Sequence, residues 1–239
     1  MAEYSLKIVR YTPGEGRKSY IQTYTIKAEP TWSVLDCLNE IKWHHDGTLA
    51  FRRSCRSGIC GSCAMNINGK NRLACETRIE DLKKKTITIT PLPFFEIIKD
   101  LVVDLDPFFE GIKSIKPFLA AKGINPEKRE MVQSKEAREK LDGLYECIYC
   151  GSCTSSCPSF WHNHRFMGPA ALLRAQRYLA DSRDNSKKER FALIDTEDGV
   201  WRCHTVFNCV EACPKNLNPA EAIQKIKKNL IKDGLLRKL

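Results

Sequence analysis

The N-terminal part of the chain alternates hydrophobic and polar positions with the period of two that is typical of strands. The alternation runs from Tyr4 to Ile8, and residues 20–27 resume it after a turn-forming stretch at residues 12–16. This pattern predicts a β-hairpin. Residues 86–90, which alternate Thr and Ile, predict a further strand.

A helix is predicted between these strands. Val34, Leu38 and Ile41 recur at helical spacing, and the pattern reaches Trp43. Cys37 falls near the apolar side of this helix. A lone helical cysteine is most often a small core residue, so we expect no metal at Cys37.

Farther along the chain, strand alternation ends and helical patterns take over. Helices are predicted at residues 135–145 and at residues 169–180, where Pro169 suits the first helical position. A last helix is predicted to begin after Asn218, which is a capping residue, and to end before Gly234.

The change of pattern predicts two domains and an α+β fold class. A chain of 239 residues is long enough to bury two cores. The expected domains are residues 1–104, rich in strands, and residues 105–239, which are helical.

Two cysteine runs in the helical half predict cubane-type iron-sulfur sites. Residues 147–158 form a complete C-x2-C-x2-C-x3-C-P run, and residues 203–214 repeat its spacing with Val206 at the second cysteine position. The fourth cysteine of each such run ligates the other cluster. Valine offers iron no lone pair, so one site should hold 3Fe-4S. The predicted 4Fe-4S ligands are Cys147, Cys150, Cys153 and Cys213. The predicted 3Fe-4S ligands are Cys157, Cys203 and Cys209.

A third motif, at residues 55–63, matches the C-x4-C-x2-C spacing of plant-type 2Fe-2S ferredoxins. Gly58 and Gly61 let the backbone turn tightly and bring N–H groups close to sulfur. An Asn-Gly pair at residues 68–69 predicts a type I′ hairpin that folds Cys75 back toward the loop. The predicted 2Fe-2S ligands are Cys55, Cys60, Cys63 and Cys75. We therefore expect a β-grasp 2Fe-2S ferredoxin-like domain followed by an all-α bacterial-ferredoxin-like domain with two cubane-type clusters.

The sequence favours metal binding over disulfide formation for its 12 cysteines. The N-terminus enters a strand pattern directly, with no secretory signal, so a reducing compartment is expected rather than disulfides. Zinc is the alternative metal. Structural zinc prefers two separated cysteine pairs that close one tetrahedron, and three thiolates in one short loop exceed that pattern.

The net charge of the chain indicates which kinds of partner it could bind. A net charge of +10 suits an acidic protein or an anionic membrane surface. Lys and Arg are dispersed, and residues 83–85 are the one triple run, so we expect no nucleic-acid partner. No apolar segment has the length of a membrane span, so the chain is not expected to be integral to a membrane.

The motifs resemble those of the iron-sulfur subunit of succinate dehydrogenase and fumarate reductase. The resemblance covers nearly the whole chain. Beyond the cysteines, it includes residues 52–61, 68–71, 99–104, 168–170 and 181–184.

The resemblance implies an electron-transfer subunit that carries no substrate chemistry itself. In this family the subunit lies between a flavoprotein with covalent FAD, which interconverts succinate and fumarate, and a cytochrome b-type membrane anchor. The anchor binds quinone, menaquinone or ubiquinone, and commonly heme. Electrons would pass from 2Fe-2S through 4Fe-4S to 3Fe-4S as part of the respiratory chain and the tricarboxylic acid cycle. The expected location is peripheral, on the cytoplasmic face of a bacterial inner membrane.

The resemblance also implies quinone contacts. Trp161 and His162 follow the first cubane run, and many ubiquinone-linked members have tryptophan where this chain has His162, so menaquinone is at least as well supported. Lys227 in the last helix matches a family lysine close to the quinone, although a snorkelling lysine is the alternative. His204, beside Cys203, favours succinate oxidation over fumarate reduction.

Other functions remain as alternatives. A quinol:fumarate reductase would use the same subunit. A free-standing soluble multi-cluster ferredoxin is a second class, but small diffusing carriers need one domain and many are acidic, whereas this chain has two domains and a charge of +10. Co-purification with a flavoprotein separates these classes, and metal analysis would identify a zinc protein.

Overall fold

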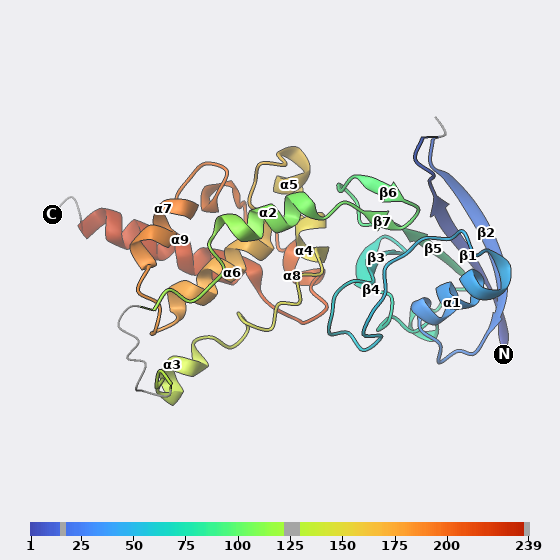
Figure 1. Ribbon diagram of the computed structural model, residues 1–239, viewed down its shortest axis with the longest axis horizontal. Helices are drawn as coiled ribbons and strands as arrows, with labels where there is room; N and C mark the ends of the chain where they lie inside the picture. The colour runs from blue at the N-terminus through green and yellow to red at the C-terminus, as the bar shows by residue number, and fades with distance from the viewer. Residues whose placement is uncertain (15–17, 122–129, 237–239) are drawn as a thin grey trace. The chain divides into compact units, whose positions relative to one another are not determined.

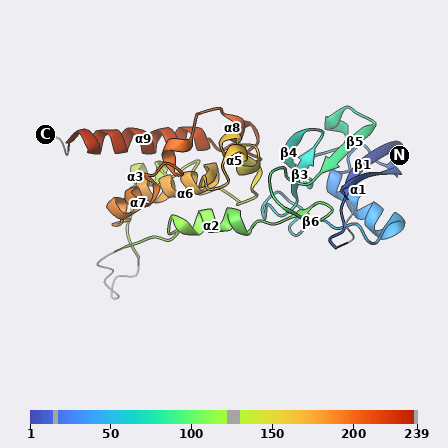
Figure 2. The ribbon, with the colours of Figure 1, turned by 90° about the horizontal axis from the view of Figure 1, so that it is seen from above.

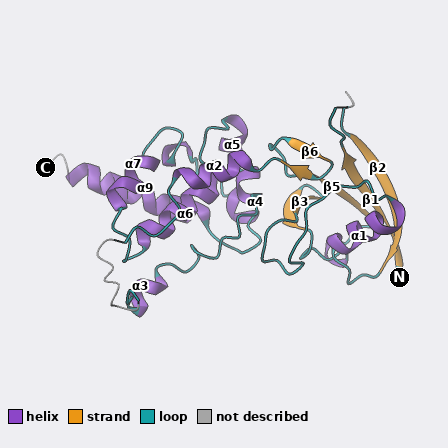
Figure 3. Ribbon diagram, viewed as in Figure 1, coloured by secondary structure: helices purple, strands orange, loops and turns teal. Residues whose placement is uncertain are grey.

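The computed structural model describes residues 1–14, 18–121 and 130–236. The path of the chain can be followed in Figure 1. Packing divides the chain into two compact units. The first is Met1–Leu105 with Ile148–Ser156, and the second is Asp106–Cys147 with Cys157–Leu239. The strands of the described residues belong to the first unit, and the second unit is helical (Figure 3). The predicted α+β class is confirmed.

The predicted boundary after residue 104 stays a prediction, but the structure changes one assignment. Ile148–Ser156, which the sequence placed in the helical domain, packs with the first unit. Within that unit, the Asn71 amide donates to the carbonyl oxygen of Ser152 at 3.3 Å and to Ser156 Oγ at 2.8 Å. Hydrogen bonds between residues so far apart in the chain leave no local sequence pattern.

A five-stranded sheet in the order β2-β1-β5-β3-β4 forms the first unit. Its strands are β1 Ala2–Arg10, β2 Tyr20–Ala28, β3 Ala64–Ile67, β4 Lys70–Leu73 and β5 Thr86–Thr90. β1 pairs antiparallel with β2 and parallel with β5 (Figure 1). Leu6 and Ile8 are buried whereas Lys7 between them is exposed, as strand alternation requires. The predicted hairpin and last strand are confirmed.

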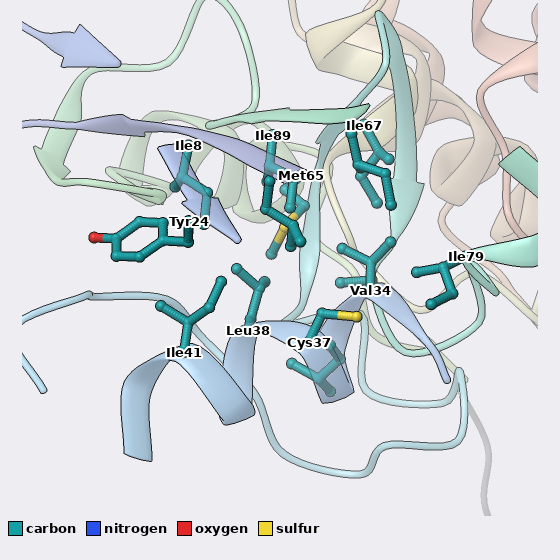
Figure 4. Packing of buried hydrophobic residues seen from close by; sticks show 14 of the residues in the cluster. Ile8, Tyr24, Val34, Cys37, Leu38, Ile41, Met65, Ile67, Ile79 and Ile89 are labelled. Carbon is teal, nitrogen blue, oxygen red and sulfur yellow. The ribbon is translucent and has the colours of Figure 1, made fainter. Parts of the chain in front are cut away.

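One helix covers the buried face of this sheet. Ser33 and Asp36 form a capping box at the start of α1, Val34–Glu40, which continues into a π-helical turn, η1, at Ile41–His45. The α1 side chains pack against the strand residues (Figure 4). Cys37 is fully buried in this core, as expected for a small apolar residue.

The remaining elements of the first unit are short. They are η2 Glu80–Leu82, β6 Ile97–Lys99, β7 Val102–Val103 and α4 Ser152–Ser155. β6 and β7 form a separate two-stranded sheet.

An ion cluster is buried at the end of β1. The Arg10 side chain, 6% exposed, binds Asp100 through Nε at 2.9 Å and also binds Asp46 and the Tyr24 hydroxyl. The Asp100 side chain is fully buried. Because a buried charge is costly without a partner, this cluster ties the segments around Asp46 and Asp100 to the sheet.

The second unit is a helical assembly. Its elements are α2 Asp106–Ser114, α3 Lys135–Glu139, α5 Pro158–His162, α6 Gly168–Ala180, α7 Lys187–Ile194, η3 Val200–Arg202, α8 Asn208–Glu211 and α9 Pro219–Leu236. α6 packs between α2 and α9 (Figure 2). The predicted helix at residues 169–180 is confirmed as α6. Within the described ranges, no helix combines the length and hydrophobicity that a bilayer crossing requires.

The helix predicted at residues 135–145 was too long. α3 ends at Glu139, and Gly143 adopts φ +76° in the turn that follows. The chain folds back there, so that the Arg138 guanidinium lies 4.3 Å from the centroid of the Tyr145 ring.

The last helix begins as predicted but extends farther. The side chain of Asn218 accepts the N–H of Glu221 at 2.9 Å, which confirms the cap. The predicted stop before Gly234 is wrong, because α9 continues to Leu236. A glycine inside a helix costs only about 1 kcal/mol, which the preceding turns of α9 can offset.

Candidate metal centres

The first cysteine loop, residues 55–63, directs backbone N–H groups at sulfur. The N–H groups of Ser57, Ile59 and Cys60 lie 3.4, 3.3 and 3.2 Å from Cys55 Sγ. These bonds lower the pKa of the Cys55 thiol to about 6. Because cysteines bind metal as thiolates, the loop suits a cluster ligand.

The β3–β4 hairpin brings two further cysteines together. Asn68 and Gly69 have φ of +50° and +83°, the sign that a type I′ turn needs at both positions. The N–H of Ala74 donates to the carbonyl oxygen of Cys63 at 3.1 Å. Burial raises the pKa of Cys63 to about 12, and the neighbouring Cys75 thiol adds to the rise. Cys75 therefore lies beside Cys63.

The loop and the hairpin also contact each other. A Cβ atom on Gly58 would lie 1.8 Å from Glu76 Oε1, so the loop packs against the residue that follows Cys75. A Cβ atom on Gly61 would lie 2.8 Å from the carbonyl oxygen of Ile148. Both glycines have positive φ, at +68° and +72°. The structure thus places all four predicted 2Fe-2S ligands in one region of the first unit.

The two bacterial-type runs share one backbone conformation at matching positions. Tyr149 and Gly151 have φ of +54° and +79°, and Thr205 and Phe207 have φ of +57° and +68°. Each run then enters a four-residue helix, α4 or α8. Val206 lies between the two left-handed residues, as the second cysteine does in the first run. The second run is therefore folded as a cluster-binding run that lacks one thiol.

Three cysteines of the second unit line one cavity. Cys157, Cys203 and Cys209 lie around it together with Val206. Burial raises the pKa of Cys209 to about 12, and the nearby thiols of Cys157 and Cys203 add to it. Burial also raises the pKa of Cys157. Crowded, buried thiolates need a positive partner, which bound iron supplies. The donor set fits a cluster with three ligands.

The predicted 4Fe-4S ligands belong to different units. Cys147 and Cys213 pack against a core of the second unit that consists of Leu144, Leu173, Leu217 and Ala222. The Leu217 N–H lies 3.4 Å from Cys213 Sγ. In the first unit, Cys150 packs against the sheet core and Cys153 is buried in α4. A common site for these four residues stays a prediction.

In the part of the chain that the structure describes, no three Cys, His, Asp or Glu side chains form a site for a single metal ion. The thiolates of a polynuclear cluster are shared among several iron atoms, whereas structural zinc collects four ligands at one centre.

The residues expected at the quinone lie outside the three-cysteine cavity. Trp161 and His162 end α5, which begins after Cys157, and both are exposed. Lys227 on α9 is half-buried, and its Nζ donates to the carbonyl oxygen of Cys203 at 2.7 Å. Lys227 therefore contacts the cluster loop and does not simply extend into solvent.

Sequence analysis missed a second contact between α9 and this loop. Gln224 lies one turn before Lys227 and donates from Nε2 to Thr205 Oγ1 at 2.6 Å. Thr205 is β-branched and has positive φ, which is unusual for such a residue. Neither residue type indicates a function by itself, so only their proximity reveals the pair.

Comparison with known proteins identifies the family. Models of a 2Fe-2S iron-sulfur cluster binding domain and a 4Fe-4S dicluster domain match residues 5–110 and 143–217. The chain is 47% identical over 232 residues to the mitochondrial succinate dehydrogenase (ubiquinone) iron-sulfur subunit of Candida glabrata, covering 96% of this chain and 92% of that protein. The chain belongs to the family of succinate dehydrogenase iron-sulfur subunits.

Solved structures agree with membership of the succinate dehydrogenase iron-sulfur subunit family. A chain of the Mycobacterium smegmatis Sdh1 complex in the apo form superposes with a TM-score of 0.86 at 26% identity, over 97% of this chain and 96% of that chain. A hypothetical protein from Helicobacter pylori has a TM-score of 0.57 at 16% identity, over 94% of this chain and 39% of that chain. The second likeness concerns the fold alone.

Family membership confirms the predicted function and cofactors. The chain is an electron-transfer subunit of succinate:quinone oxidoreductase with one 2Fe-2S, one 4Fe-4S and one 3Fe-4S cluster. A succinate dehydrogenase iron-sulfur subunit works in a complex with a flavoprotein and a membrane anchor. Neither fumarate reductase nor a free soluble ferredoxin is favoured.

Proposed function

We propose that this chain binds its three clusters through the eleven cysteines of its three motifs and conducts electrons from succinate oxidation toward membrane quinone. The 2Fe-2S cluster is assigned to Cys55, Cys60, Cys63 and Cys75. The 4Fe-4S cluster is assigned to Cys147, Cys150, Cys153 and Cys213. The 3Fe-4S cluster is assigned to Cys157, Cys203 and Cys209. When bound, the clusters supply one-electron transfer.

The observation that carries the assignment is the cavity shared by Cys157, Cys203 and Cys209, with Val206 on its wall. The second run has the backbone of a complete cysteine run, but its middle position offers iron no ligand. The residues around the 2Fe-2S loop support that part of the proposal, since three N–H groups stabilise a thiolate at Cys55. The protein's task is to fix ligands and hydrogen bonds, which set cluster potentials.

We expect each ligand substitution to remove one cluster and leave the others. In the complex purified with its flavoprotein, metal analysis should give about nine irons per chain and no zinc. Cys209→Ser should abolish the electron paramagnetic resonance (EPR) signal of oxidised 3Fe-4S, and Cys60→Ser should alter or abolish the signal of reduced 2Fe-2S. Cys37→Ala is the matched control, because this buried cysteine lies on α1 and belongs to none of the three cysteine motifs. Zinc, or an intact 3Fe-4S signal in Cys209→Ser, would contradict the assignment.

At the quinone end, we propose contacts from Trp161, His162 and Lys227. The support is that α5 follows Cys157 directly and that Lys227 contacts Cys203. His162→Ala and Lys227→Met should each reduce quinone reductase activity of the assembled complex about tenfold, which corresponds to the loss of one or two hydrogen bonds. Assays with menaquinone and ubiquinone analogues would decide the quinone type. Unchanged activity in both variants would remove these residues from the site.

The partners are proposed as a flavoprotein with covalent FAD and a cytochrome b-type anchor that carries any heme. The net charge of +10 suits an acidic partner surface or anionic lipid. Placement on the cytoplasmic face of a bacterial inner membrane stays a prediction, since the relative from Candida glabrata is mitochondrial.

A further inference from the structure

The backbone of the 3Fe-4S run lacks an anchor that the 4Fe-4S run has. In a complete run, iron binds the middle cysteine and so anchors the backbone between its two left-handed residues. Val206 makes no such bond, yet Thr205 and Phe207 on either side keep φ of +57° and +68°. Left-handed conformations of non-glycine residues persist only when surrounding contacts enforce them. The flanking thiolates of Cys203 and Cys209 would hold the two ends of this loop, so its middle needs contacts other than iron.

Helix α9 supplies two hydrogen bonds to the loop. Gln224 and Lys227 lie three positions apart, so their side chains project from the same face of the helix. Gln224 Nε2 donates to Thr205 Oγ1 at 2.6 Å, and Lys227 Nζ donates to the carbonyl oxygen of Cys203 at 2.7 Å. The two bonds hold Cys203 and Thr205, on the N-terminal side of Val206, against α9.

The α9 side of this contact is packed against the core. Ile223 precedes Gln224 and Ile226 precedes Lys227; both isoleucines are fully buried, and Ile223 also lines the three-cysteine cavity. Gln224 itself is partly buried. A hydrogen bond shielded from water in this way holds its partner more strongly than an exposed one.

We infer that Gln224 is a positioning residue for the 3Fe-4S site: through the Thr205 hydroxyl, it replaces the anchor that the missing thiolate would have provided. The bond keeps the left-handed backbone at Thr205, and thereby keeps Cys203 and Cys209 facing the same cavity. The inference rests on the proposed ligand assignment, since it requires the trinuclear cluster to lie among Cys157, Cys203 and Cys209.

The sharpest test compares Thr205→Val with Thr205→Ser in the holo-complex. Valine keeps the β-branch and removes the hydroxyl, whereas serine keeps the hydroxyl. We expect Thr205→Val and Gln224→Leu to broaden the EPR signal of oxidised 3Fe-4S and to speed its loss during incubation with a chelator about fivefold, the effect of one hydrogen bond. Thr205→Ser should behave as wild type. Lys225→Gln on the exposed side of α9 is the matched control.

Different outcomes would contradict the role of Gln224 and the assignment of the 3Fe-4S ligands. An unchanged 3Fe-4S line shape and loss rate in both Thr205→Val and Gln224→Leu would overturn the role of Gln224 while leaving the ligands intact. Equal damage in Thr205→Val and Thr205→Ser would also overturn it, because the hydroxyl would then be irrelevant. Absence of a 3Fe-4S signal from the wild-type complex would contradict the proposed ligand assignment instead. In every variant the 2Fe-2S signal serves as the internal standard.

Discussion

Val206→Cys is expected to convert the 3Fe-4S site into a 4Fe-4S site. The variant completes a run whose backbone already matches that of the first run on both sides of position 206. Val206 also lies on the wall of the cavity formed by the three cysteines and is about half-exposed, so a thiolate at this position would be within the site and accessible to a fourth iron. The iron content should rise by about one atom per chain, and the EPR signal of oxidised 3Fe-4S should disappear.

The same variant should lower the reduction potential of the site. The charge of the added thiolate is offset by that of the added iron, but electron donation from the thiolate to iron favours the oxidised cluster, and cluster type also sets the potential. Quinone reduction by the complex should slow accordingly. Val132→Cys is the control, since that valine is exposed and lies outside the motifs. Persistence of the 3Fe-4S signal in Val206→Cys would show that position 206 does not face iron, and would contradict our interpretation of the second run.

Arg10→Met is expected to have the largest effect on stability. Arg10 is the cationic partner of Asp100 and Asp46, and the Asp100 side chain is fully buried. Asp100 also accepts the N–H groups of Tyr11 and Ala50 at 3.0 and 2.8 Å, so it cannot turn toward water without breaking those bonds. Removing one partner of a buried ion pair costs about 3–5 kcal/mol.

The measurement is the temperature at which the holoprotein loses the EPR signal of its reduced 2Fe-2S cluster. It should fall by roughly 10 °C or more in Arg10→Met. Lys113→Met is the matched control, because Lys113 pairs with Glu110 at the surface and both side chains are about two-thirds exposed. An exposed pair contributes at most about 1 kcal/mol. Similar losses in the two variants would mean that the buried cluster adds no stability beyond a surface pair.

From the sequence alone, we could predict the features of this protein that depend on neighbouring residues, namely strands, turns and the set of clusters. Strand alternation around Leu6 and the Asn-Gly turn at residues 68–69 appear in the structure as predicted, because each depends on neighbouring residues only. Cysteine spacing likewise predicted the cluster set, and the missing ligand at Val206 requires no coordinates, since a side chain without a lone pair cannot bind iron. The helix ends were less predictable, as α9 passing Gly234 illustrates.

Tertiary structure alone decided what holds these local elements in place. Ile148–Ser156 packs with the first unit through Asn71, and the 203–205 loop is bonded by Gln224 and Lys227. The buried pair of Arg10 and Asp100 joins residues 90 positions apart. The partners in such contacts are ordinary polar residues whose spacing follows no period. Which two meet is set by how helices and sheet pack, so their roles become visible only in the folded chain.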